Sequence, residues 1–288
     1  MNGILIIDKP ADWTSHDVVG KLRGLLHERR IGHGGTLDPM ATGVLPVFVG
    51  KATRGVQFAV EGDKEYRALL RLGTVTDTQD TTGTVLEEHP VIAGPAELET
   101  VLARFRGDIE QIPPMYSAVK VKGQPLYKLA RRGETVDRAP RPVTIRLLEQ
   151  EGWDRDGVRL RVVCSKGTYV RTLCHDIGAQ LGCGGCMAAL RRTRVADFTE
   201  EQAVTLETVA ELAAAGQAEE LLRPVEACFA SLPRLDIGGE TERRCRNGMG
   251  FAVRGEPGDY RVFGADGSFL MLGRLDETGR MTSIRNFF

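Results

Sequence analysis

The residue types that could do chemistry gather in one glycine-rich stretch, IGHGGTLDPMATGVLPVFVG, at positions 31–50. Within it Asp38 stands before Pro39, and a proline disfavours the helical conformation for the residue that precedes it. The apolar run Val44–Val49 predicts a buried strand that anchors the loop. A carboxylate at the tip of such a loop can act as a nucleophile or a base without any cofactor. The local pattern alone favours the alternative that Asp38 caps a turn, a common role of Asp beside Pro and Gly.

A carboxylate withdrawn from water tends to take up a proton unless a cation holds it ionised. Arg171, in the first turn of a predicted helix after CSKGTY, is the candidate cation. It could instead pair with Asp176 or point to solvent, as helix arginines usually do. A second pattern, Cys183-Gly-Gly-Cys186, is a single CxxC without another Cys or His pair at zinc-finger spacing, so we expect no metal.

The elements that must position these residues are mixed along the chain. Short apolar runs predict strands at 3–7, 44–49, 66–72, 84–88, 143–151 and 158–164, with a further strand ending near 195. Helical spacing predicts helices at 51–60, 95–107, 168–181 and 205–222, and one that Thr14 or Ser15 caps. Strands and helices without strict alternation point to an α+β fold.

Two segments differ in composition from the rest. Residues 113–142 carry seven Lys or Arg against two acids, interleaved with Tyr116 and Tyr127 and punctuated by Pro and Gly. We expect a hairpin and a short helix there with little burial, mobile until phosphates neutralise the charge. Residues 231–288 are rich in glycine and predict a small β module, which leaves 1–230 as the main domain.

Composition bounds the class of protein. The chain has 288 residues, 42% hydrophobic and 27% charged, and no apolar run approaches the ~20 residues of a membrane span. Without a signal peptide or a disulfide framework, we expect a soluble cytoplasmic protein. The net charge is −1, yet residues 158–194 carry seven Lys or Arg against one acid. Such a run can form an RNA-binding face or a solvated face balanced by nearby acids.

Several blocks together resemble the TruB-type tRNA pseudouridine synthases. They are IDKPADWTSHDVV, GHGGTLDPMATGVLPV, KEYR at 64–67 and CSKGTYVRTL at 164–173. PPMYSAVKVKGQPLYKLARRG at 113–133 resembles that family's RNA-clasping insertion. The resemblance implies a mixed, largely antiparallel sheet with flanking helices, followed by a PUA-like RNA-binding module.

The resemblance also implies roles for individual residues. Asp38 would be the catalytic aspartate and Arg171 its ion-pair partner. The other implied site residues are Tyr66, Tyr169 and Leu190 around the base, His33 in recognising and displacing the flipped nucleotide, and Lys9 in supporting the pocket. Without the resemblance, Tyr66 in a strand and Tyr169 on a helix would most often be core residues.

The expected function is conversion of uridine 55 in the T-arm loop of tRNA to pseudouridine, by base flipping and an aspartate nucleophile. We expect a monomer that needs tRNA as its partner and no cofactor or membrane. One rival is a non-catalytic RNA-binding factor, which the presence of Asp38 disfavours. The other is a carboxylate glycosidase, which needs a second carboxylate that the key loop does not offer.

Overall fold

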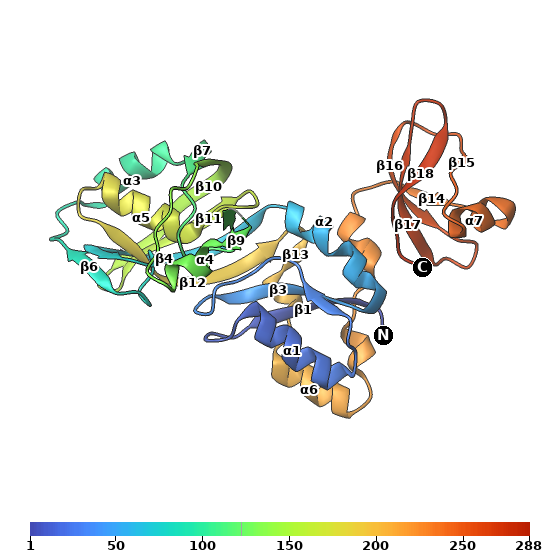
Figure 1. The fold of residues 1–288 in the computed structure, drawn as a ribbon, viewed down its shortest axis with the longest axis horizontal. Coiled ribbons are helices and arrows are strands. Elements are labelled where there is room, and N and C mark those ends of the chain that lie inside the picture. Colours follow the sequence, from blue (N-terminus) through green and yellow to red (C-terminus); the bar gives the residue numbers. More distant parts are fainter. Residues whose placement is uncertain (122) are drawn as a thin grey trace.

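Two sheets of unequal size organise the chain (Figure 1), and the computed structural model describes residues 1–121 and 123–288. Among these residues the larger sheet has nine strands and the smaller has five. The larger contains β1 (Gly3–Lys9), β2 (Ile31–His33), β3 (Thr42–Val49), β4 (Lys64–Leu72), β7 (Gly107–Gln111), β10 (Arg141–Asp154), β11 (Gly157–Cys164), β12 (Gly185–Val195) and β13 (Phe198–Thr199). The smaller contains β14 (Arg234–Asp236), β15 (Phe251–Ala252), β16 (Gly258–Phe263), β17 (Phe269–Leu275) and β18 (Arg280–Asn286).

The remaining elements are helices and two short hairpins. The α-helices are α1 (Ser15–Leu26), α2 (Val56–Glu61), α3 (Pro95–Arg104), α4 (Leu126–Ala130), α5 (Val170–Gln180), α6 (Leu206–Ala214) and α7 (Gly239–Arg246). The 3₁₀ helices are η1 (Gly50–Gly55), η2 (Glu200–Gln202), η3 (Ala218–Leu221) and η4 (Val225–Phe229). The hairpins pair β5 (Thr74–Thr76) with β6 (Val85–Glu88) and β8 (Lys120–Val121) with β9 (Gln124–Pro125).

The strand order of the larger sheet is β1-β3-β12-β4-β11-β10-β7, with β2 added to β3 and β13 to β12. In the described chain its neighbouring strands are antiparallel, except that β12 runs parallel to β3. The predicted α+β fold with a mixed, largely antiparallel sheet is therefore confirmed.

The two halves of this sheet are covered differently. Helices α1 and α6 pack on one face of β1 and β3, and η1 and α2 pack on the other. Strands buried on both faces are apolar throughout, which explains the run Val44–Val49. Strand β4 instead alternates, because α3 and α5 cover one face and the other is open. The Asp38 loop joins β2 to β3 beside the half that contains β4 (Figure 1).

Helix boundaries follow the capping signals more closely than the apolar pattern. Thr14 caps α1, accepting a hydrogen bond from the backbone N–H of Asp17 as predicted. The predicted helix 51–60 is a 3₁₀ turn followed by α2, and the predicted helix 205–222 ends at Ala214. Gly216 follows with φ +74, a left-handed conformation that an α-helix cannot continue through.

The C-terminal sheet is the small β module expected from the sequence, but it also carries the unpredicted helix α7. That helix buries only Cys245 among its residues, so it offers no apolar period to detect. The module packs against the rest of the chain through an aromatic cluster. Phe287 lies 5.9 Å from Phe229, and Phe58 lies 5.0 Å from Phe229, between ring centroids.

The segment 113–142 forms the expected hairpin and short helix, and the prediction of little burial holds for most of it: among its described residues only Pro113, Pro114, Ser117, Leu126 and Leu129 are buried. Leu126 is fully buried and Leu129 is 8% exposed. Both lie in α4, which has only five residues and is therefore too short for an amphipathic pattern to show in the sequence.

Candidate active site

The loop that carries Asp38 is fixed by hydrogen bonds from three directions. The Ser15 hydroxyl donates to the Leu37 carbonyl at 3.2 Å and accepts from the Leu37 N–H at 2.9 Å. The ammonium group of Lys9 donates to the Pro39 carbonyl at 3.1 Å. A loop tied on both sides of Asp38 holds that carboxylate in one place without help from Asp38 itself.

Arg192 ties the glycine-rich side of the same loop. Its guanidinium is buried and donates to the carbonyls of Val44, Thr36 and Gly35 at 2.8, 3.4 and 3.2 Å. Gly43 has φ +99, and a Cβ there would lie 2.2 Å from the Arg192 carbonyl oxygen. Only glycine allows β3 to approach β12 this closely.

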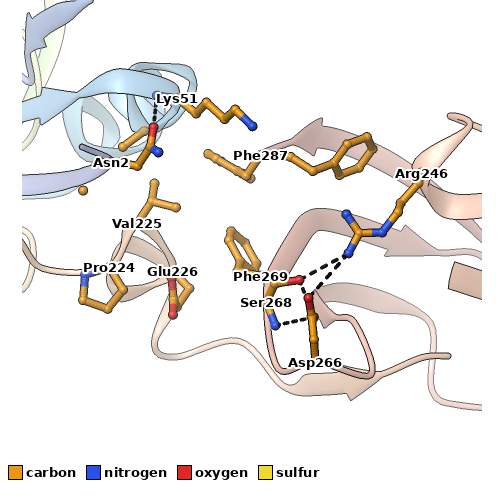
Figure 2. A pocket seen from close by; sticks show the side chains of 13 residues that line it. Asn2, Lys51, Pro224, Val225, Glu226, Arg246, Asp266, Ser268, Phe269 and Phe287 are labelled. Carbon is orange, nitrogen blue, oxygen red and sulfur yellow. Dashed lines mark hydrogen bonds and ion pairs between the residues drawn. The ribbon is translucent and has the colours of Figure 1, made fainter. Parts of the chain in front are cut away.

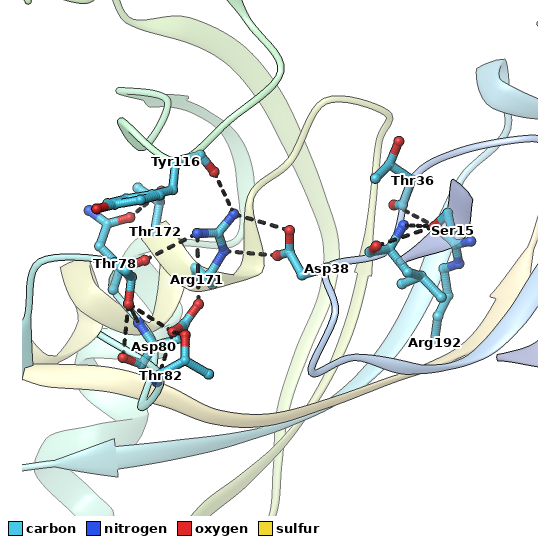
Figure 3. A network of polar contacts seen from close by, with 12 residues as sticks. Ser15, Thr36, Asp38, Thr78, Asp80, Thr82, Tyr116, Arg171, Thr172 and Arg192 are labelled. Carbon is cyan, nitrogen blue, oxygen red and sulfur yellow. Dashed lines mark hydrogen bonds and ion pairs between the residues drawn. The ribbon is translucent and has the colours of Figure 1, made fainter. Parts of the chain in front are cut away.

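The structure brings Asp38 and Arg171 together (Figure 3). Arg171 Nε lies 2.9 Å from Asp38 Oδ2, and Arg171 Nη2 donates to Asp38 Oδ1 at 3.3 Å. The side chain of Arg171 is 6% exposed, whereas that of Asp38 is 36% exposed. Among the described residues Arg171 thus pairs with Asp38 rather than with Asp176 or solvent, and the carboxylate keeps a face open for a substrate.

The surroundings of Asp38 change how readily its carboxyl ionises. Burial raises the pKa of the Asp38 carboxyl above its ordinary value, and this outweighs the attraction of Arg171, which acts in the opposite direction. The negative charge of Asp80 adds to the rise. The charge of Arg171 therefore increases the ionised fraction of Asp38 relative to burial alone.

Asp80 is the site residue that sequence reasoning missed. Its Oδ2 lies 3.7 Å from Arg171 Nη1, and its side chain is 6% exposed. Asp80 Oδ1 accepts from the Thr78 hydroxyl at 2.8 Å and from the Thr82 N–H and hydroxyl at 3.0 and 2.5 Å. Its polar loop between β5 and β6 reads as ordinary turn sequence, so nothing local marks it as part of a site.

Tyr66 and Leu190 line the sheet beside the loop. Both are 8% exposed and belong to the same apolar cluster as Leu37 and Ala41. Burial raises the pKa of the Tyr66 phenol, and the nearby charge of Arg192 opposes that rise. These contacts place the two side chains next to the Asp38 loop, and they are also what a core role would produce.

Tyr169 directly precedes α5 rather than lying on it, because the helix begins at Val170. Its N–H donates to Gln111 Oε1 at 3.0 Å, and Gln111 Nε2 donates to its carbonyl at 3.3 Å. Gln111 sits at the end of β7, 58 residues away in sequence, so only the fold reveals this support. The tyrosine is held two residues before Arg171.

His33 is the last residue of β2, just before the Asp38 loop, and Lys9 is the last residue of β1. Burial, helped by the charges of His16 and Arg192, lowers the pKa of His33, so its ring is neutral near pH 7. Its Nδ1 is buried without a hydrogen-bond partner among the described residues. Lys9 is fully buried and also donates to the carbonyls of Pro10 and Trp13, which fits its expected supporting role.

The basic run 158–194 does not form a free positive face. Each of its Lys and Arg side chains has an acidic or carbonyl partner, as the interpretation of a charge-balanced face expects. The ion pairs are Arg159–Asp154, Arg161–Glu65, Lys166–Glu61, Arg171–Asp38, Arg191–Asp8 and Arg194–Glu65, and Arg192 donates to carbonyls.

A pocket of about 400 Å³ lies away from this site, between the C-terminal module and the N-terminal part of the chain (Figure 2). It is lined by residues such as Lys51, Arg246 and Phe269, and by none of the residues placed around Asp38 in this section. In the described ranges no three His, Cys, Asp or Glu side chains are grouped as metal ligands would be. Nor does any described helix have the length and apolar character to cross a membrane.

A two-lobed mixed sheet that presents an aspartate paired with a buried arginine is the arrangement expected of a pseudouridine synthase. Residues 23–170 match the N-terminal domain model of the TruB family pseudouridylate synthases, and residues 171–230 match the C-terminal domain model of tRNA pseudouridylate synthase B. The chain belongs to the TruB family of pseudouridylate synthases.

Similar proteins cover nearly the whole chain. It is 46% identical to tRNA pseudouridine synthase B of Pseudomonas fluorescens strain Pf0-1, over 99% of this chain and 95% of that protein. It is 46% identical to tRNA pseudouridine synthase B of Ralstonia nicotianae, over 93% and 87%. An H/ACA ribonucleoprotein bound to a substrate RNA containing 2′-deoxyuridine has a similar chain, with TM-score 0.74, 25% identity and coverage of 99% and 85%.

Proposed function

We propose that the protein isomerises uridine 55 in the T-arm loop of tRNA to pseudouridine, with Asp38 as nucleophile. Family membership and the curated relatives, which are tRNA pseudouridine synthases B, support the reaction and the substrate. The observation that carries the site assignment is the ion pair of 2.9 Å between the buried Arg171 and the partly exposed Asp38.

The reaction needs no oxidation and no added group. The glycosidic bond from C1′ to N1 of the base breaks, the base turns, and a bond from C1′ to C5 forms, while C5 loses its proton and N1 takes one up. Asp38 acts as nucleophile on the flipped nucleoside, and Arg171 opposes the protonation of its carboxylate that burial favours.

The target base must leave the RNA stack to reach Asp38. Tyr66 and Tyr169 then replace the stacking that the base loses, because aromatic faces bind extruded bases, and Leu190 adds an apolar contact. His33 is neutral near pH 7, so it can donate one hydrogen bond and accept another while it displaces and recognises the nucleotide.

Contacts outside the pocket supply most of the affinity. We assign them to the segment 113–142, whose Lys120, Lys128 and Arg131 show no ion pair in the described chain, and to residues 231–288. Residues 1–230 form the catalytic domain in this proposal. The enzyme acts as a monomer in the cytoplasm, where tRNA is the partner it requires.

A glycosidase mechanism is disfavoured although the fold brings in a second carboxylate. Asp80 is 5% exposed, and its oxygens are occupied by threonine donors and by Arg171. A second catalytic carboxylate must reach across the scissile bond. Asp80 lies behind the arginine and cannot take that role.

The test is tritium release from T-arm RNA that contains 5-tritiated uridine, since isomerisation expels the C5 hydrogen and binding alone does not. Asp38→Asn is expected to abolish release while RNA binding stays nearly unchanged. Asp197→Asn is the matched control, because Asp197 is exposed and shows no ion pair in the described structure. Normal release by Asp38→Asn would refute the assignment.

A further inference from the structure

Arg171 is bonded to the segment 113–142 as well as to two carboxylates. Its Nη2 donates to the backbone carbonyl of Tyr116 at 2.8 Å, and the same nitrogen donates to Asp38 Oδ1 at 3.3 Å (Figure 3). One nitrogen thus joins the proposed nucleophile to the segment that we assign to RNA contacts.

The opposite edge of the guanidinium is held as well. Arg171 Nη1 donates to the Thr78 carbonyl at 3.2 Å and faces Asp80 at 3.7 Å. Because a guanidinium is planar and rigid, contacts at both Nη atoms fix the plane of the whole group. Asp38 and Asp80 compete for this cation, and the Tyr116 carbonyl keeps Nη2 on the Asp38 side.

The Tyr116 carbonyl is itself positioned by its own segment. Arg138 donates to the carbonyl of Pro113 at 3.1 Å, and the N–H of Tyr127 donates to the carbonyl of Ser117 at 3.0 Å. Both donors lie within residues 113–142, and the two carbonyls that accept from them lie on either side of Tyr116. A movement of this segment would therefore move the acceptor away from Arg171.

We propose that the Tyr116 carbonyl is a positioning group that couples the placement of residues 113–142 on RNA to the orientation of Arg171 toward Asp38. The inference rests on the proposed function. With the segment in place, Arg171 pairs more closely with Asp38 than with Asp80, and the nucleophile is ionised. With the segment withdrawn, Arg171 turns toward the more deeply buried Asp80, and Asp38 tends to take up a proton.

The test weakens this one acceptor and compares it with a reference protein that has the same side chain at that position. The Ser117 hydroxyl has no hydrogen-bond partner among the described residues, and no bond from its N–H is found there, so Ser117→Ala is a suitable reference. Lactic acid at position 117 then converts the amide after Tyr116 into an ester, which is a weaker acceptor. Single-turnover tritium release is measured across pH at saturating T-arm RNA.

The ester is expected to lower the rate near neutral pH by about tenfold relative to Ser117→Ala, as for loss of a charge-assisted hydrogen bond. The acidic limb of the pH–rate profile should move to higher pH, and the half-saturating RNA concentration should stay unchanged. A merely structural role for Tyr116 would not move that limb.

Lactic acid in place of Ala139 is the control, because it weakens the Arg138 carbonyl, which accepts no hydrogen bond among the described residues, and leaves Arg171 untouched. An ester at 117 that behaves like its reference, or that changes only the half-saturating RNA concentration, would overturn the coupling. An equal shift of the limb by both esters would overturn it too. Wild-type protein assayed alongside tests the proposed function separately, since the absence of tritium release there refutes that function rather than the coupling.

Discussion

Replacing Arg171 by methionine removes the charge between Asp38 and Asp80 while keeping an unbranched side chain. Loss of one partner of a buried ion pair typically costs ~3–5 kcal/mol. The Asp38 side chain is 36% exposed, so water screens part of this loss. We therefore expect the lower end, about 3 kcal/mol, which corresponds to a fall of about 100-fold in the single-turnover rate.

The direction in which the pH–rate profile of Arg171→Met should move follows from the pKa of Asp38. Burial raises the pKa of Asp38 and Arg171 lowers it, so removing Arg171 raises this pKa further. A carboxylate with a raised pKa loses its charge at higher pH than free aspartate does. The rate of Arg171→Met should therefore fall away at higher pH than that of the wild type, and an alkaline buffer should restore part of it.

The assay is single-turnover tritium release at saturating T-arm RNA, measured across pH together with thermal unfolding. Arg161→Met is the matched control, because Arg161 Nε also lies 2.9 Å from a carboxylate, that of Glu65, but its side chain is 41% exposed. We expect the control to lose less than about 1 kcal/mol of stability and no activity. If Arg171→Met changes only the half-saturating RNA concentration, Arg171 is a phosphate contact and the argument from burial fails.

Three further predictions follow from other parts of the molecule. Burial lowers the pKa of Lys9 to about 8 from its ordinary 10.5, so between these pH values the unfolded chain holds the proton more tightly. Wild-type stability relative to Lys9→Met should then rise over that window by up to about 3 kcal/mol in urea unfolding, and a flat difference would contradict the burial effect. Trypsin should cut early at Lys120, Arg131 or Arg132, and at Lys122, which lies outside the described residues. T-arm RNA should suppress these cuts. Equal resistance with and without RNA would mean that the segment is already ordered. Deleting residues 231–288 should weaken tRNA binding more than it slows single-turnover chemistry. Because Phe229 then loses its partner Phe287, circular dichroism is used to check that the truncated protein folds. A folded protein that is inactive at saturating RNA would contradict this prediction.

The sequence by itself determined the parts of the fold and site that depend on neighbouring residues. Asp38 before Pro39 and the apolar run to Val49 predict a stiff loop on a buried strand, and Thr14 predicts the start of α1. Such features follow from backbone conformation and local hydrogen bonds, which a short stretch of chain fixes. The family blocks added the remaining site residues, but no local pattern separates a pocket tyrosine such as Tyr66 from a core one.

Only the tertiary structure decided which charges meet. Arg171 lies 133 residues from Asp38 and also faces Asp80, a residue that no local pattern singles out. The basic run 158–194 looked available for RNA, yet the sheet sets its side chains against acids from distant strands, as Arg161 against Glu65 shows. Electrostatic energy depends on separations of a few ångströms and on burial, and the order of residues along the chain fixes neither.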